Sequence, residues 1–253
     1  MSEVFGLDKF IEHFKNFNDN YIIVGGSACS LLFNEVNIDF RATKDIDIII
    51  ITENINKEFG TSFWNFINDG GYDTYFSITD LKPHFYRFLN PKNRSYPKMI
   101  ELFSRKQDIF ESANSIFTPI KIDEEISSLS AILLDDDYYS FLKSGSIIVN
   151  GAAVLKPEFL ICFKARAHVD LTNKKNNGIF VNEADSKKHK NDIFRLLTLL
   201  NEGDKFEIPT SVKNDLRDFL LITDKEKIDV EKLTNGALNY ETAKRILKDI
   251  FDL

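Results

Sequence analysis

The strongest indication of the fold is Tyr21-Ile22-Ile23-Val24-Gly25-Gly26-Ser27, an apolar run that ends in two glycines and a serine. It predicts a short strand that turns directly into a helix. Backbone N–H groups at such a turn can approach an anion closely, and the helix dipole and the Ser27 hydroxyl favour one there. The run therefore fits a phosphate site, although a Gly-Gly turn before a helix is often purely structural.

The next segment, Arg41-Ala42-Thr43-Lys44-Asp45-Ile46-Asp47-Ile48, places two acids two residues apart. On a strand their side chains share one face, which Thr43 and Arg41 continue. Neighbouring carboxylates repel each other unless a cation lies between them, and oxygen ligands suit Mg²⁺. A solvated strand start would explain the pair equally simply, but isoleucines run on to Ile51 and predict a buried central strand.

A third acid, Glu101, lies within Met99-Ile100-Glu101-Leu102-Phe103. Apolar neighbours on both sides make this an unfavourable place for a carboxylate without a partner. A metal ion shared with Asp45 and Asp47 would supply that partner. A salt bridge to Lys98 or Arg105 is the alternative.

Length and composition restrict the class of protein. The chain has 253 residues, 43% of them hydrophobic and 28% charged, which is typical of globular proteins. Two cysteines, no apolar run of membrane length and no signal-like start predict a cytoplasmic protein without a membrane partner. The net charge of −7 argues against a generally basic, nucleic-acid-binding surface.

We expect an α+β fold with two domains. Residues 1–155 alternate helical and strand patterns and predict an α/β domain with a mixed sheet, whereas residues 156–253 predict helices alone. Asn150-Gly151 predicts a tight hairpin. The segment 173–185, rich in Asn and Lys, predicts a mobile surface loop. Further strands are expected at 21–24, 45–51, 72–78, 84–89, 99–104, 116–122, 146–149 and 152–155, and helices at 7–17, 27–33, 57–68, from about 126, 157–173, 186–201, 209–221, 225–234 and 240–251.

Lys164 is on an unexpected face of the helix that begins at Pro157. The apolar stripe of that helix includes Leu160, Phe163 and Ala167, and the lysine falls within it. Either its stem carries the ammonium group out to solvent, or the ammonium group meets a charged partner such as a triphosphate. Residues 156–195 contain nine Lys or Arg and five Asp or Glu, a local charge of +4 that leaves −11 elsewhere.

Together these segments resemble the AbiEii/AbiGii toxin-type nucleotidyltransferases, within the superfamily related to DNA polymerase β. The resemblance rests on the Gly25-Gly26-Ser27 turn, the Arg41-to-Asp47 strand, the 155–167 helix start and Lys188-His189-Lys190-Asn191-Asp192. It implies a nucleotidyltransferase domain followed by a helical domain, with a nucleoside triphosphate (NTP) and Mg²⁺ or Mn²⁺ between them.

The resemblance also implies roles for individual residues. Gly25, Gly26 and Ser27 would hold the triphosphate, with Arg41 and Thr43 beside them. Asp45, Asp47 and, less securely, Glu101 would bind the metal and serve catalysis, and Glu101 could accept the proton of the attacking hydroxyl. Lys164 would act on the triphosphate or serve as the essential basic group, and Asp192 matches a late acidic position of the active site.

The expected activity is transfer of a nucleoside monophosphate (NMP) to an acceptor hydroxyl with release of pyrophosphate. The resemblance allows tRNA or a protein as the acceptor and a cognate antitoxin as a partner in a toxin–antitoxin or abortive-infection system. The basic 156–195 segment modestly favours RNA. A non-catalytic nucleotide-binding or partner-binding protein with the same fold is the alternative.

Overall fold

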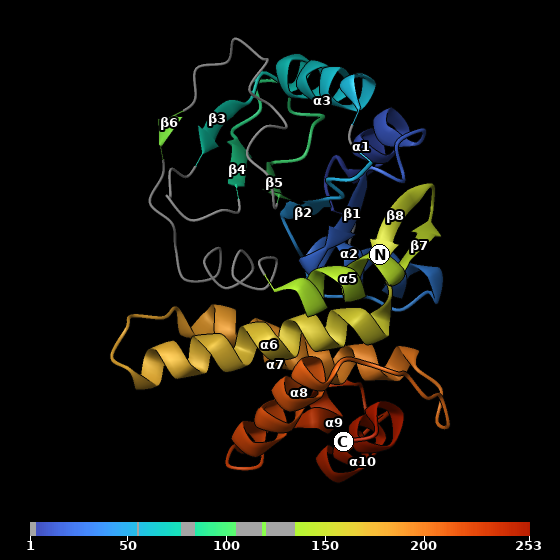
Figure 1. Ribbon diagram of the computed structural model, residues 1–253, viewed down its shortest axis with the longest axis vertical. Coiled ribbons are helices and arrows are strands. Elements are labelled where there is room, and N and C mark those ends of the chain that lie inside the picture. Colours follow the sequence, from blue (N-terminus) through green and yellow to red (C-terminus); the bar gives the residue numbers. More distant parts are fainter. Residues whose placement is uncertain (1–3, 55, 77–83, 105–117, 120–134) are drawn as a thin grey trace. The chain divides into compact units, whose positions relative to one another are not determined.

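The computed structural model describes residues 4–54, 56–76, 84–104, 118–119 and 135–253. The chain forms two compact units (Figure 1). The first unit comprises residues 1–122 and 145–155, and the second comprises residues 123–144 and 156–253. The division after Leu155 coincides with the expected domain boundary, but the second unit also includes 123–144. A two-domain organisation with a single boundary thus stays a prediction, whereas the α+β class is confirmed.

An eight-stranded mixed sheet forms the centre of the first unit, in the order β6-β3-β4-β5-β2-β1-β8-β7. Strand β2 lies antiparallel to β1 and parallel to β5, and β4 lies antiparallel to both β3 and β5. The elements are α1 (Leu7–Phe14), β1 (Tyr21–Val24), α2 (Gly25–Glu35), β2 (Asp45–Ile50), α3 (Lys57–Gly70), β3 (Asp73–Phe76), β4 (His84–Leu89), β5 (Met99–Ser104), β6 (Thr118–Pro119), β7 (Ser146–Val149) and β8 (Ala152–Leu155).

The core of this unit explains why these segments become strands. All four residues of β1 are buried, and β2 changes from alternating burial at its acidic start to continuous burial at Ile48–Ile50. A strand with neighbours on both sides and covered faces is expected to be apolar throughout. Aromatic rings of α1 and α3 pack against one another, since Phe10 and Phe14 both contact Phe66. Burial of these large rings contributes much of the stability of the unit.

The hairpin predicted at Asn150-Gly151 is confirmed. Strands β7 and β8 pair in antiparallel register from Ser146↔Leu155 to Val149↔Ala152. Both turn residues have positive φ, 50° at Asn150 and 88° at Gly151, as a two-residue turn of the I′ type requires.

The described elements of the second unit are all helical. They are α5 (Asp136–Ser144), α6 (Pro157–Asn176), α7 (Glu183–Leu196), a 3₁₀ turn (Leu197–Leu199), α8 (Thr210–Thr223), α9 (Val230–Leu233) and α10 (Tyr240–Phe251). Helix α5 belongs here because the Phe141 ring stacks on Phe159 and the Tyr138 hydroxyl donates to Asp215.

The long loop expected at 173–185 is wrong, because only residues 177–182 separate α6 from α7. Ion pairs extend both helices into the polar segment: Lys174 pairs with Asp170 one turn earlier, and Lys175 pairs with Glu183. The Asn182 side chain caps α7 by accepting from the Ala184 N–H.

Two expected elements fall largely or partly outside the described residues: the strand at 116–122, of which only Thr118–Pro119 is described, and the helix from about 126. Within the described ranges, no helix combines the length and the apolar character that a membrane span needs.

Candidate metal and phosphate site

The register of the sheet aligns the acids of the first unit. Arg87 on β4 lies opposite Glu101 on β5, Glu101 lies opposite Asp47 on β2, and Asp47 lies opposite Val24, the last residue of β1. Residues paired across neighbouring strands direct their side chains to the same face. The alternation along β2 adds Asp45 to that face.

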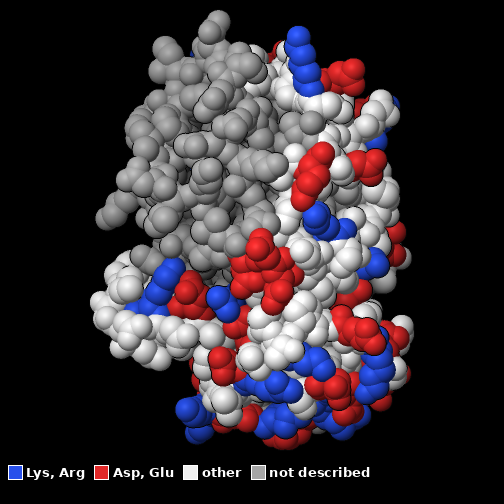
Figure 2. Space-filling view, in the orientation of Figure 1, with Lys and Arg blue, Asp and Glu red and all other residues white. Residues whose placement is uncertain are grey.

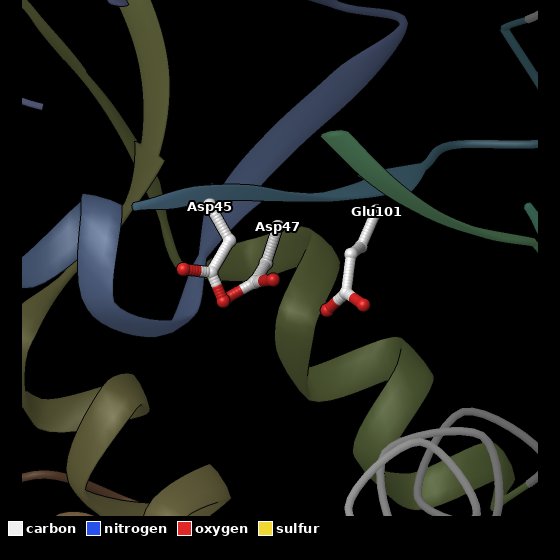
Figure 3. A group of neighbouring side chains, drawn as sticks. All are labelled: Asp45, Asp47 and Glu101. Atoms are coloured by element: carbon white, nitrogen blue, oxygen red, sulfur yellow. The ribbon is translucent and has the colours of Figure 1, made fainter. Parts of the chain in front are cut away.

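Asp45, Asp47 and Glu101 form one acidic group, called here the carboxylate triad. One carboxylate oxygen from each lies within 4.8 Å of the others. Figure 3 shows the two aspartates on β2 and the glutamate on β5, with all three carboxylates on the same side of the strands. Glu101 is buried, whereas the two aspartates are half-buried. The metal-ligand grouping predicted from the sequence is thus assembled by the fold.

Glu101 has a protein partner that the sequence analysis missed. The Arg87 Nε atom donates to Glu101 Oε1 over 2.6 Å, and the second guanidinium contact, through Nη2, completes a salt bridge. Lys98, one of the two expected partners, is exposed, and Arg105 lies outside the described residues. The β4–β5 hairpin could have indicated the true partner, because both strands were predicted with their correct bounds and their register places Arg87 opposite Glu101.

Burial raises the pKa of the Glu101 carboxyl above its ordinary value, and the Arg87 charge only partly opposes this effect. A hydrogen bond with the Asp47 side chain also opposes it, while the negative charge of Asp45 raises the pKa further. Burial and the Asp45 charge thus disfavour the ionised form of Glu101, and a cation bound to the triad would favour it.

The two glycines are required where the helix meets the acids. Gly25 has φ +66°, and a Cβ atom there would lie 1.9 Å from Asp47 Oδ2. A Cβ atom at Gly26 would lie 2.8 Å from Thr43 Oγ1 and 3.5 Å from an Arg41 Nη atom. The side chains of Arg41, Thr43 and Asp47 thus all reach the backbone at the first residues of α2. The glycines make room for them.

Ser27 has a structural role. Its hydroxyl donates a hydrogen bond to the Asp45 backbone carbonyl and so fixes the start of α2 against the start of β2. The Lys44 backbone N–H in turn donates to Asp45 Oδ1 over 3.0 Å. The expected triphosphate role of the Gly25-Gly26-Ser27 turn stays a prediction.

Lys164 and Asp192 belong to the second unit, where they form a buried ion pair. Lys164 Nζ donates to Asp192 Oδ2 over 2.9 Å, and the Arg195 guanidinium lies 3.4 Å from Oδ1. Lys164 is 4% exposed and Asp192 is fully buried. The lysine therefore meets a charged partner instead of extending to solvent. Its expected action on a triphosphate stays a prediction.

The basic stretch 156–195 does not form a surface of one sign. Besides the buried Lys164, four of its lysines pair with acids: Lys174 with Asp170, Lys175 with Glu183, Lys188 with Asp185 and Lys190 with Glu226. Figure 2 likewise shows blue and red side chains interspersed over the C-terminal helices. The local charge of +4 is consequently a weaker argument for an RNA acceptor than the sequence suggested.

The chemistry of the donor set fits a divalent metal ion. Three carboxylates supply hard oxygen ligands of the kind that Mg²⁺ and Mn²⁺ prefer. The absence of a side chain at Gly25 leaves room for the Asp47 carboxylate among them. Three ligand oxygens leave positions for water and for substrate phosphates, as Mg²⁺ sites usually do. The triad can hold such an ion, although its identity does not follow from the geometry.

The sequence matches no protein-family model and no curated protein sequence. Among solved structures, the Megavirus polyadenylate synthase aligns with 91% of this chain at 9% sequence identity and a TM-score of 0.35. The alignment covers 38% of the viral enzyme, so this chain spans well under half of its length. Identity and score at this level are too low to establish a shared fold.

Proposed function

We propose that the protein is a metal-dependent nucleotidyltransferase that transfers an NMP from an NTP to an acceptor hydroxyl. The observation that carries this proposal is the convergence of Asp45, Asp47 and Glu101 beside the glycine-started helix α2. A carboxylate triad suits cations that accompany a triphosphate, and a helix N-terminus with free backbone N–H groups suits the phosphates themselves. The two features lie side by side in the first unit because β1 leads into α2 and pairs with β2.

In the proposed enzyme, different residues bind the cation and the phosphates. Asp45, Asp47 and Glu101 hold the cation, which supplies neutralisation of the charge that develops on the phosphates. The backbone of Gly25 and Gly26 receives phosphate oxygens, and Arg41, beside Gly26, adds a positive charge. Most of the rate enhancement then comes from positioning and electrostatic stabilisation.

In the proposed reaction the acceptor oxygen forms a bond to the α-phosphorus while the bond to the β-phosphate oxygen breaks. Pyrophosphate leaves with the electron pair of the broken bond. The hydroxyl proton passes to the Glu101 carboxylate.

The acceptor and the biological role are finer proposals. By the resemblance of its motifs, the protein would be a toxin-type enzyme that acts on tRNA or on a protein hydroxyl and is controlled by an antitoxin. The roles of Lys164 and Asp192 in triphosphate binding and catalysis belong to the same group of proposals. If the protein instead binds nucleotides without turnover, the triad would still bind a cation and NTP.

To test the proposal, the protein is incubated with Mg²⁺ or Mn²⁺, each of the four α-labelled NTPs, and total RNA or total protein. Transfer of the label to RNA or protein is then measured. We expect one NTP to label one acceptor class with release of pyrophosphate. Asp45→Asn and Asp47→Asn should each lower the labelling rate at least about a hundredfold, because each removes a metal ligand.

Glu12→Gln is a matched control, since Glu12 is an exposed carboxylate on α1 that forms a surface pair with Lys15. It should leave the rate unchanged. NTP binding that depends on Asp47 but gives no transfer to any acceptor would favour the non-catalytic alternative. Labelling that survives both aspartate substitutions would contradict the proposal.

A further inference from the structure

Arg87 pairs with one member of the triad, Glu101. Its guanidinium binds Glu101 Oε1, and the strand register holds the two residues directly opposite each other. The Arg87 side chain is 20% exposed and the Glu101 side chain 11%, so the pair is largely shielded from water. Electrostatic interactions at such a site are considerably stronger than at an open surface.

The charges of the triad and Arg87, taken together, match one divalent ion. Three ionised carboxylates carry −3, and the guanidinium, which stays protonated in proteins, returns +1. The sum of −2 equals the charge that one Mg²⁺ or Mn²⁺ neutralises. Arg87 also repels that ion, because both bind the same carboxylate.

We infer that Arg87 is a positioning residue and an internal counter-ion, which fixes Glu101 and keeps cation binding weak until a nucleotide is present. The inference rests on the metal site of the proposed function. An NTP brings its own negative charge and then tightens cation binding, so that the ion enters with the substrate and leaves with pyrophosphate. Weak binding in the nucleotide-free protein thus serves turnover.

The experiment measures binding of Mn²⁺ alone to the full chain by electron paramagnetic resonance, with and without a non-hydrolysable NTP analogue. Wild type should bind Mn²⁺ weakly, and the analogue should tighten binding. Arg87→Gln should bind Mn²⁺ about tenfold more tightly than wild type without nucleotide, because one positive charge is removed next to Glu101. The effect of the analogue should shrink accordingly.

Two variants separate charge from other effects. Arg87→Lys keeps the positive charge and should restore the wild-type affinity. Lys98→Gln removes a charge from an exposed residue three positions from Glu101 and should change the affinity less than about twofold, because solvent screens it.

A further pair keeps the test decisive if Arg87→Gln does not fold. Glu101→Gln alone should weaken Mn²⁺ binding, because Arg87 then faces only two carboxylates. Adding Arg87→Gln to it should recover most of the loss, since Asp45 and Asp47 alone restore a charge of −2. Unchanged or weaker binding after removal of Arg87, in either background, overturns the inference and leaves the proposed function standing. Failure of wild type to bind Mn²⁺ with or without the analogue overturns both.

Discussion

The carboxylate triad of the first unit and the Lys164–Asp192 pair of the second solve opposite electrostatic problems. In the triad, three acids converge and Arg87 pairs with Glu101, whose pKa is raised because burial and the Asp45 charge disfavour its ionised form. In the pair, one fully buried acid contacts two cations, Lys164 and Arg195. A cluster with surplus negative charge is suited to an exogenous cation, whereas a carboxylate contacted by two cations is compensated within the protein and helps to hold two helices together. A buried carboxylate therefore indicates cation binding only where the protein leaves its charge incompletely compensated.

The largest expected effect is the loss of stability when the Lys164–Asp192 pair is broken. Asp192→Ala leaves Lys164 buried without its carboxylate and should lower the free energy of unfolding by about 3–5 kcal/mol. Urea denaturation followed by circular dichroism measures it. The double variant Lys164→Met/Asp192→Leu should recover much of the loss, because it removes both charges. A loss below about 1 kcal/mol for Asp192→Ala would contradict this account of the pair.

The next effect concerns pH and another buried group of the second unit. Burial lowers the pKa of His168 from 6.5 to about 4, although its hydrogen bond to the Ser186 carbonyl opposes the shift. As pH falls below 6.5, the unfolded chain binds a proton that the folded chain does not, so stability falls until about pH 4 and this contribution then levels off. The difference amounts to at most about 3 kcal/mol.

Urea midpoints between pH 7 and pH 4 measure this effect, and wild type should lose more stability over that range than His168→Gln. Parallel curves for the two proteins would show that His168 does not titrate as its burial requires.

A smaller effect tests the glycine beside the triad. Gly25→Ala introduces a Cβ at φ +66° and against the Asp47 carboxylate, and it should cost about 1–3 kcal/mol. It should also weaken Mn²⁺ binding, because Asp47 must move. Gly60→Ala is the matched control: it lies inside α3, where the added Cβ meets no described atom within 4 Å outside its own helical turn, and it should stabilise by about 0.5–1 kcal/mol. Equal effects at the two glycines would contradict the close packing inferred at Gly25.

The smallest expected effect is the change in stability when Asp47, a member of the triad, loses its charge. In metal-free buffer, Asp47→Asn should leave the free energy of unfolding within about 1 kcal/mol of wild type, because it removes repulsion along with a hydrogen-bonding carboxylate. Thermal denaturation with and without Mg²⁺ measures it, and the stabilisation by Mg²⁺ that we expect for wild type should be lost. A large loss without metal would show that the triad is a structural network like the Lys164–Asp192 pair.

Several elements could be predicted because their signals are local. The bounds of β4, β5, β7, β8 and α10 follow from apolar runs, turn residues and a helical stripe within each segment. The loop at 173–185 was mispredicted because ion pairs and an Asn cap, rather than composition, determine where α6 ends and α7 begins. The shared face of Asp45 and Asp47 was predictable for the same local reason, the period of two along a strand.

The sequence alone therefore determined the residue types of the site and the class of the fold, since alternation, glycine turns and isolated acids are visible within short windows. Only the tertiary structure decided the partners. Arg87 is 14 residues from Glu101, and Lys164 is 28 residues from Asp192, so each contact depends on strand register or helix packing. Local pattern specifies which charges need compensation. The pairing of distant elements specifies which are compensated by protein and which are left for a ligand.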